Sequence, residues 1–333
     1  MLNFNVSKNS FSEIQPGEKV EIDVLIEDKS TGTTKRGTEF FSLKLKDIKE
    51  KEIGAKVWNT NIWPDDFKIG SVCKVFGEAS SYQDQLQLVI SRVTESTTPR
   101  VDFATKSPIG IDREALWSEL VNIVGAFKEP LAKFLGETIL EDEQITKRIQ
   151  EAPAAVKIHN NWIGGLLEHA IALCRLAESA ITQYQKYCPN LSRDKILLGC
   201  LIHDLGKIRE FDYSGPKISY TKYGHLLGHI AWGPLWLSKE FQRFLAIKNK
   251  GEDVLEKAKE DFLEIVHIVI SHHGKLEYGS PVVPSTLEAI IVHNLDMLDT
   301  QAMHAIKAMD NESDLKGFSE RSWTYGANYK IIR

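Results

Sequence analysis

The hydrophobic pattern of this chain changes its period once, near residue 100. Before that point, short runs such as 40–46 alternate apolar and polar residues, which is the two-residue period of a half-buried strand. From residue 111 onward, apolar residues recur every three or four positions, as on an amphipathic helix. The stretch 96–110 has the Ser, Thr and Pro composition of a linker. The sequence therefore predicts a multidomain chain with an N-terminal arm at 1–17, an all-β domain at 18–95, this linker, and an all-α domain at 111–333.

Five strand-like runs lie in the first domain, at residues 20–26, 40–46, 55–58, 72–77 and 86–90. Turn residues separate the runs, and residues 31–37 are expected to form a turn or loop. Several short strands in close succession predict a small closed barrel. The OB-fold is the natural candidate, and OB-folds commonly bind oligonucleotides across one face.

Nucleic-acid contacts in this barrel are predicted from its aromatic and basic side chains. Trp58 and Tyr82 are candidates for stacking on bases, and Lys56 lies on the polar side of a strand, where it can meet a phosphate backbone. For each aromatic residue the alternative is a place in the core of the barrel, because aromatic residues dominate protein cores. Residues 1–100 carry 14 Lys and Arg against 15 Asp and Glu, and the whole chain has a formal net charge of −5. A binding groove would therefore have to be local, since no broad basic surface is available.

A histidine and an aspartate stand together at the end of an apolar run, residues 196–202, that reads as a buried helix. Burying His203 and Asp204 without partners is costly, and metal coordination is a common way to offset that cost. Gly206 fits a sharp turn at a helix end, and Lys207 follows where it can meet an anion. The alternative is that the His203 and Asp204 side chains form a hydrogen bond with each other and bind no metal.

Further histidines and an aspartate fall near the inner ends of the neighbouring helical runs, one or two on each. Helical bundles build metal sites from inward-facing side chains in this way, and mixed imidazole and carboxylate ligands suit manganese, iron, cobalt or zinc. His267 and His293 are expected to be hydrogen-bonded core residues, and His225 is either on the substrate side or structural. Asp299 is an alternative ligand or a residue that orients one. The candidate metal ligands are His169, His203, Asp204, His229, His272, His273 and Asp296.

This order of residues resembles the HD-domain superfamily of metal-dependent phosphohydrolases. With the barrel ahead of it, the chain resembles the YhaM-type 3′–5′ exoribonucleases over about residues 18–330. The matching stretches are 56–58, 153–155, 165–166, 203–207, 227–230, 271–275, 278–281 and 293–299.

The resemblance implies a helical HD domain that hydrolyses phosphodiester bonds of single-stranded RNA, and of single-stranded DNA as a secondary substrate, from the 3′ end. It implies one or two divalent ions per subunit, with manganese the first choice and cobalt, iron or zinc as alternatives. One ion would be held by His169, His203, Asp204 and Asp296. Asp204, a catalytic residue in this scheme, would bridge to a second ion held by His229 and His272, with His273 as a further ligand.

The resemblance further implies that Lys207 contacts the scissile phosphate, as a catalytic and substrate-binding residue. We add His225 to the substrate-binding residues, with Trp58, Lys56 and Tyr82 in the barrel. The alternative enzyme is an HD phosphohydrolase of nucleotides or cyclic dinucleotides. A nucleic-acid binder with a vestigial HD domain is disfavoured, because the set of candidate ligands is complete.

The four cysteines form no C-x-x-C pair and read as reduced thiols, which favours a cytoplasmic protein. No apolar stretch approaches the ~20 residues that span a bilayer, and the N-terminus lacks the pattern of a secretory signal. We therefore expect no membrane partner. The sequence leaves the oligomeric state open, a homo-oligomer included.

Overall fold

A computed structural model describes residues 6–82, 85–98, 112–156, 160–213, 218–247, 251–309, 315–322 and 326–332. The chain divides into two compact units, one made of residues 1–105 with 213–218 and the other of the remaining residues. We call them the barrel unit and the helical unit. Most of the predicted linker, and with it the proposed domain boundary, lies outside the described residues, so that boundary stays a prediction.

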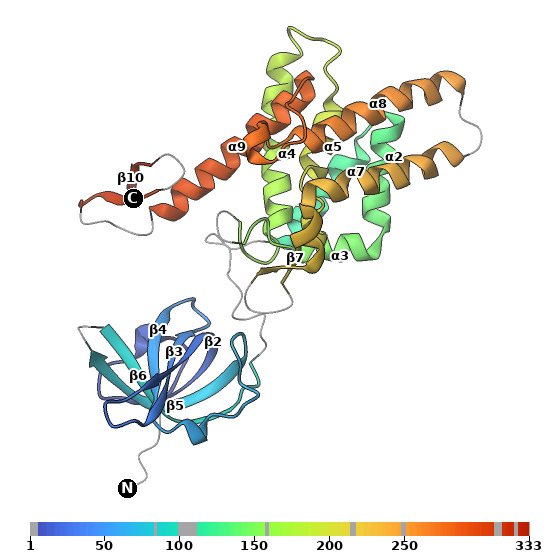
Figure 1. The fold of residues 1–333 in the computed structure, drawn as a ribbon. Helices are drawn as coiled ribbons and strands as arrows, with labels where there is room; N and C mark the ends of the chain where they lie inside the picture. Colours follow the sequence, from blue (N-terminus) through green and yellow to red (C-terminus); the bar gives the residue numbers. More distant parts are fainter. Residues whose placement is uncertain are drawn as a thin grey trace. The chain divides into compact units, whose positions relative to one another are not determined.

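The barrel unit is a closed five-stranded barrel with OB-like topology (Figure 1). The strand order is β1-β2-β3-β4-β6-β5, and the pairing of β2 with β5 closes the sheet. β4 and β6 pair in parallel, whereas the other barrel strands pair antiparallel. The short strand β1 lies parallel to β2 as an added edge strand. The strands are β1 (Val6–Lys8), β2 (Lys19–Thr33), β3 (Glu39–Lys46), β4 (Glu52–Val57), β5 (Val72–Tyr82) and β6 (Gln85–Glu95).

The alternating residues of the strands fill the barrel. On β2 the side chains of Val20, Ile22 and Val24 are buried. β2 extends to Thr33, into the segment 31–37 that the sequence predicted as a loop, because Thr33 still pairs with Glu39 of β3. The prediction of a turn holds only for the residues after Thr33.

The helical unit contains nine helices among its described residues, as predicted for the second domain (Figure 1). Two two-stranded sheets accompany the helices, β7–β8 between α6 and α7 and β9–β10 after α9, and the all-α prediction did not include them. No described helix is long and apolar enough to cross a membrane. The elements are α1 (Arg113–Gly125), α2 (Pro130–Glu141), α3 (Glu143–Glu151), α4 (Gly165–Tyr184), α5 (Arg193–Ile202), α6 (Lys207–Glu210), β7 (Phe211–Asp212), β8 (Ser219–Tyr220), α7 (Lys222–Ala246), α8 (Glu252–Ser271), α9 (Leu287–Ala308), β9 (Phe318–Arg321) and β10 (Asn328–Lys330). Three 3-10 turns complete the list: η1 (Phe11–Glu13), η2 (Thr60–Ile62) and η4 (Leu276–Tyr278).

Helix α5 is the central element of the helical unit. It packs against α2, α4, α8 and α9, and nine of its ten residues are buried. The Ser192 side chain caps its first turn by accepting from the backbone N–H of Lys195. Because α5 runs through the middle of the bundle, the residues that follow its last turn are delivered to the interior.

The sequence placed a helix end at Gly206, but α5 already ends at Ile202 and α6 begins at Lys207. Residues 203–206 form a turn in which the Lys207 N–H donates to the Asp204 carbonyl. The predicted role of Gly206 as a helix-end glycine was wrong, since its φ of −60° is ordinary right-handed backbone. A Cβ on Gly206 would lie 2.1 Å from the His229 carbonyl oxygen. Glycine is required there so that the backbone of α7 can approach.

Candidate metal centre

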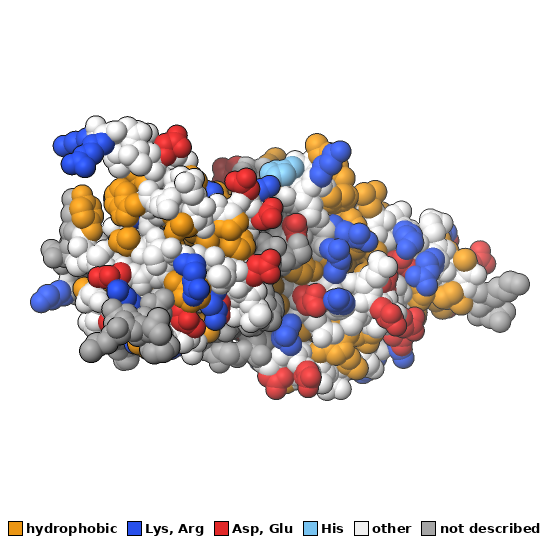
Figure 2. Space-filling model, turned by 90° about the horizontal axis from the view of Figure 1, so that it is seen from below, with side chains coloured by type: hydrophobic (Ala, Val, Ile, Leu, Met, Phe, Trp, Pro, Cys, Tyr) orange, Lys and Arg blue, Asp and Glu red, His pale blue; other side chains and the backbone are white. Residues whose placement is uncertain are grey.

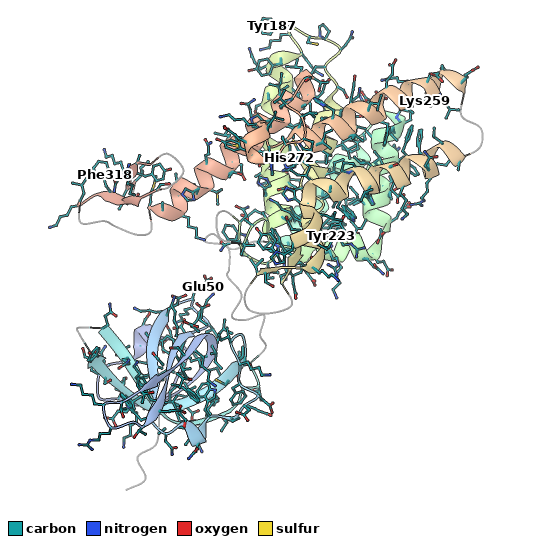
Figure 3. All side chains as sticks on the ribbon, viewed as in Figure 1. Glu50, Tyr187, Tyr223, Lys259, His272 and Phe318 are labelled. Atoms are coloured by element: carbon teal, nitrogen blue, oxygen red, sulfur yellow. The ribbon has the colours of Figure 1, made fainter. Side chains whose placement is uncertain are left out.

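Two groups of potential metal ligands meet inside the helical unit. His169 of α4, His203 after α5 and Asp296 of α9 form the first group. The second consists of His229 of α7 with His272 and His273 at the end of α8. Within each group the potential ligand atoms all lie within 4.8 Å of one another. Figure 3 labels His272 within the bundle of helices that supplies these side chains.

The Asp204 carboxylate lies between the two groups. Its Oδ2 is 3.4 Å from Nε2 of His203 and 4.0 Å from Nε2 of His169. Its Oδ1 is 3.4 Å from Nε2 of His229 and 3.6 Å from Nε2 of His272. One oxygen therefore faces each group, which is the arrangement that a carboxylate bridging two cations requires. The structure thus brings all seven candidate ligands together.

Backbone carbonyls orient three of the imidazole rings through their Nδ1 atoms. Nδ1 of His203 is 3.1 Å from the Cys200 carbonyl, and Nδ1 of His272 is 2.6 Å from the Val269 carbonyl. A carbonyl oxygen only accepts, so each Nδ1 carries the proton and each Nε2 presents its lone pair to the centre. His273 is held similarly, with Nδ1 2.8 Å from the Tyr278 carbonyl.

Carboxylates orient the other two rings. Nδ1 of His169 is 2.7 Å from Asp299 Oδ2, and Nδ1 of His229 is 2.9 Å from Glu210 Oε2. Metal-binding histidines usually have such a partner, which fixes the tautomer and raises the basicity of the ligating nitrogen. Asp299 contacts His169 from the side away from Asp204, so the geometry favours the orienting role over the ligand role for this residue.

Several polar atoms that point into the centre lack partners. Among the described residues, nothing forms a hydrogen bond with the buried Nε2 atoms of His203, His229 and His272, or with Oδ1 of Asp204. Leaving buried polar atoms unsatisfied costs roughly 1–3 kcal/mol each. Imidazole nitrogens and a carboxylate are the donor set that divalent transition metals prefer. The residues therefore fit a metal centre.

Glycine at position 228 sets the approach of His229. Gly228 has φ +66° and interrupts α7, so that His229 begins the second part of the helix. A side chain at this φ would be strained, which explains the glycine. Because the helix is broken here, its backbone can pass close to Gly206 while the His229 ring reaches Asp204.

Charge in the centre is balanced between buried carboxylates and nearby cationic groups. Burial raises the pKa of Asp204, but the positive charge of Lys207 and the contacts with His203 and His272 outweigh it and hold that pKa well below its usual value. Burial also opposes a charge on His169, yet Asp296 and Asp299 raise the pKa of His169 to about 10. Burial lowers the pKa of His272 despite its contact with Asp204. A proton on His169 is therefore favoured, whereas a charge on His272 is disfavoured.

Metal affinity is expected to rise with pH, because an ion bound to His169 must displace that proton. The pKa of His169 is raised from 6.5 to about 10, so the proton is bound throughout the neutral range. Below about pH 10, apparent affinity at this site should increase by up to roughly tenfold per pH unit. Chelator-competition titrations at pH 7, 8 and 9 measure the slope, and calorimetry in buffers of different ionisation enthalpy counts the released proton. An affinity that does not change with pH would contradict the assignment of His169 as a ligand.

Lys207 and His225 occupy different surroundings. The Lys207 ammonium is buried and lies 2.5 Å from Asp204 Oδ2, at the edge of the first ligand group. His225 is exposed on α7, and its ring contacts Tyr220 at 5.4 Å between centroids. His225 belongs to neither ligand group. His159 lies outside the described residues.

The barrel residues predicted to contact nucleic acid lie partly together. Trp58 is 48% exposed and its ring lies 4.9 Å from that of Phe40, centroid to centroid. Lys56 lies 4.9 Å from the Phe40 centroid and donates to the Ser42 hydroxyl. Tyr82 is 64% exposed at the end of β5, in the hairpin with β6. Phe40, an aromatic residue of the same alternating run, contacts both Trp58 and Lys56, and the sequence did not indicate these two contacts.

Two other histidines support neighbouring segments by hydrogen bonds. Nδ1 of His293 contacts the His272 carbonyl at 2.6 Å, so it anchors the backbone of a candidate ligand. His267 Nε2 accepts from the backbone N–H of Ser285.

Glu210 is the site residue that sequence reasoning missed. It lies at the end of α6, 7% exposed, and holds His229. A signal was present in the sequence, since Glu210 is a carboxylate three residues after Lys207, directly beside the predicted His-Asp site. Its partner could not be foreseen, because His229 reaches it only through the break at Gly228.

Substituting Glu210 by glutamine is expected to weaken metal binding by about 10- to 100-fold, the usual effect of losing a residue that orients a metal-binding histidine. The amide nitrogen can face Nδ1 of His229 and favour the tautomer that places the proton on Nε2. Competition with a fluorescent chelator gives the affinity. Glu178→Gln, on the exposed side of α4 and paired with Arg193, is the control and should leave the affinity unchanged. Unaltered affinity in Glu210→Gln would mean that His229 is not a ligand.

The face shown in Figure 2 carries no broad basic coat among its described residues. On the face shown in Figure 2, the described Lys and Arg side chains lie among Asp and Glu side chains, and neither sign forms a continuous field. Strand binding would therefore depend on specific aromatic and basic contacts.

The chain is similar to several known proteins. A family model described as "HD domain" matches residues 166–301. The chain is 32% identical over 302 residues to the 3′-5′ exoribonuclease YhaM of Geobacillus sp. (strain WCH70), covering 88% of this chain and 86% of that protein. Among solved structures, it is similar to the second OB-fold domain of replication protein A from Methanococcus maripaludis (TM-score 0.23, 20% identity, 28% of this chain and 97% of that chain). It is also similar to the single-stranded DNA binding protein Rim1 from S. cerevisiae mitochondria (TM-score 0.21, 15% identity, 24% and 94%).

Proposed function

This chain belongs to the family of YhaM-type 3′–5′ exoribonucleases, and from that premise we propose that it shortens single-stranded RNA from the 3′ end at the metal centre of its helical unit. The observation that carries the proposal is the position of Asp204, with one carboxylate oxygen toward each group of candidate ligands. Phosphodiester hydrolysis requires that the negative charge on the phosphate is offset and that a water is activated. Two ions held in this way would meet both requirements.

The ligand set follows from the two groups. His169, His203, Asp204 and Asp296 would hold one ion, and Asp204, His229, His272 and His273 the other. Bound ions would supply a hydroxide-like water and offset the charge that develops on the phosphate. With five imidazoles and two carboxylates in the set, we propose manganese, with cobalt, iron and zinc as alternatives.

The remaining polar residues have positioning roles. Asp299 and Glu210 hold the rings of His169 and His229, so the ligand geometry exists before substrate arrives. Lys207 offsets the charge of Asp204 and offers its ammonium to a non-bridging oxygen of the scissile phosphate. Hydrolysis adds the elements of water across the bond: the phosphate keeps the new oxygen, and the 3′ oxygen of the shortened strand takes a proton.

An apolar pocket beside the second ligand group has the size for a terminal nucleoside. It measures about 470 Å³, and His229 and Glu210 form part of its wall. Leu227, Pro234 and Pro281 supply apolar surface. We propose that the last base of the strand lies here. An apolar wall fits any base, so we expect the terminal residue to be removed without regard to sequence.

The proposal is tested with purified protein, manganese and an oligoribonucleotide labelled at its 5′ end. A ladder that shortens from the 3′ end supports it. An untouched oligomer beside a cleaved mononucleotide or cyclic dinucleotide would favour the alternative HD phosphohydrolase. The same oligomer made of DNA measures the preference between RNA and DNA.

A further inference from the structure

A second cavity of about 400 Å³ lies in the helical unit, bordered by α3, α6 and α7. None of the candidate metal ligands lines it, so it is separate from the metal centre. Its volume is in the range of small-molecule binding sites. Figure 3 labels Tyr223 of its wall. The side chains that give it chemical character are Arg148, Arg209, Tyr223, Trp232, Trp236 and Lys239.

One wall of this cavity is a pair of stacked indoles. Trp232 and Trp236 are one turn apart on α7, with ring centroids 6.1 Å apart and planes within 17° of parallel. Trp236 is buried, whereas Trp232 is half-buried. Core aromatics more often meet edge to face or offset inside apolar surroundings. A partly open aromatic wall of this kind suits the flat face of a nucleobase.

Hydrogen-bond donors surround the indoles. The Tyr223 hydroxyl is buried and has no hydrogen-bond partner among the described residues. Arg148 reaches the cavity from α3, held by a 2.7 Å bond from Nη1 to the Ile208 carbonyl. Arg209 is exposed on α6, and Lys239 lies 3.2 Å from Glu240. Three cations and a phenol around one opening favour an anionic group with several acceptor oxygens.

One carboxylate also lines the cavity, and its position limits its effect. Asp142 caps α3, where its Oδ1 accepts from the backbone N–H groups of Gln144 and Ile145. That carboxylate is therefore directed to the helix end, and the cations outnumber it.

We propose that this cavity binds a nucleobase carrying a phosphate, with the base on the indole wall and the phosphate on Arg209 and Tyr223. The ligand would be a free nucleoside monophosphate or one nucleotide of a strand, because both present the same two groups. The proposal does not depend on the metal centre.

The test is binding of adenosine 5′-monophosphate to the full chain in EDTA, measured by equilibrium dialysis. We expect one nucleotide per chain, with adenosine and inorganic phosphate each at least about tenfold weaker, because each lacks one of the two groups. Trp232→Ala and Arg209→Ala should weaken binding by about tenfold or more, whereas Trp232→Phe, which keeps a stacking face, should retain most of it. Lys259→Ala, an exposed cation on α8, is the matched control and should have no effect.

A single-stranded oligoribonucleotide distinguishes the two sources of ligand. Loss of strand affinity in Trp232→Ala and Arg209→Ala, without binding of the mononucleotide, would identify a nucleotide of the strand as the occupant. The proposal is overturned if these variants change the affinity of neither ligand, or if wild type binds the monophosphate measurably but no more tightly than inorganic phosphate. Hydrolysis of a small chromogenic phosphodiester with manganese should continue in both variants, so failure here is separate from failure of the proposed nuclease activity.

Discussion

Asp204→Asn is expected to reduce RNA hydrolysis by roughly 10³-fold or more while the protein remains folded. The substitution keeps the size of the side chain but removes the charge that faces both ligand groups. Charge stabilisation by bound ions contributes several kcal/mol to the transition state, and each 1.36 kcal/mol corresponds to tenfold in rate. The measurements are turnover of a 5′-labelled RNA and metal content after dialysis, and both should fall together.

Asp261→Asn is the matched control for the loss of a buried carboxylate in the same unit. Asp261 is 3% exposed and pairs with Lys195 at 2.7 Å, outside both ligand groups. It should lower thermal stability but leave turnover per folded molecule and metal content unchanged. RNA affinity, measured by fluorescence anisotropy, should survive in Asp204→Asn because the barrel is a separate compact unit. Wild-type metal content and rate in Asp204→Asn would show that the centre has been assigned to the wrong residues.

The convergence of the candidate ligands could be predicted from the sequence, because each candidate follows or lies within a strongly apolar helical run. A histidine or aspartate in such a run has few ways to avoid the cost of burial, so the pattern indicated where the helices converge. The structure places His169, Asp204 and Asp296 within reach of one another, although they are separated by up to 127 positions. What the sequence could not give was which oxygen of Asp204 faces which group, because that depends on how the chain turns after α5.

Features that depend on a backbone break or on close approach were missed or misjudged. Gly206 looked like a helix-end glycine, yet its role is to admit the backbone at His229. Glu210 gains its partner only through the left-handed residue Gly228. In the barrel, the period-two pattern located the five barrel strands but cut β2, β5 and β6 short. For β2 the reason is that Gly32 and Thr33 look like turn residues. The space over Gly32 is filled by the Phe40 ring, which lies 2.5 Å from the position that a Cβ would occupy. Local pattern therefore gave the elements, whereas contacts between distant segments decided their ends.

Trp58→Ala is expected to weaken binding of long single-stranded RNA by roughly 5- to 100-fold, because stacking of one base contributes about 1–3 kcal/mol. Trp58 is 48% exposed and contacts Phe40, which in turn lies under the ammonium of Lys56. This group combines an aromatic platform with a cation for the backbone. The effect should appear as a higher KM for a long substrate with kcat nearly unchanged, the signature of a binding contact that the ground state and transition state share. Lys56→Ala should in addition reduce the slope of log affinity against log salt concentration by about one, the change expected when one phosphate contact is lost.

A small chromogenic phosphodiester separates this role from structural support of the metal centre. Such a substrate is too short to use the barrel, so Trp58→Ala should hydrolyse it at the wild-type rate. Tyr187→Ala, which removes an aromatic side chain that is 79% exposed in the helical unit, should affect neither substrate. If Trp58→Ala instead slows both substrates equally, the aromatic group supports the fold and the strand is held elsewhere. If it changes only the long substrate, the barrel supplies affinity for the strand, and the metal centre needs only the terminal phosphodiester.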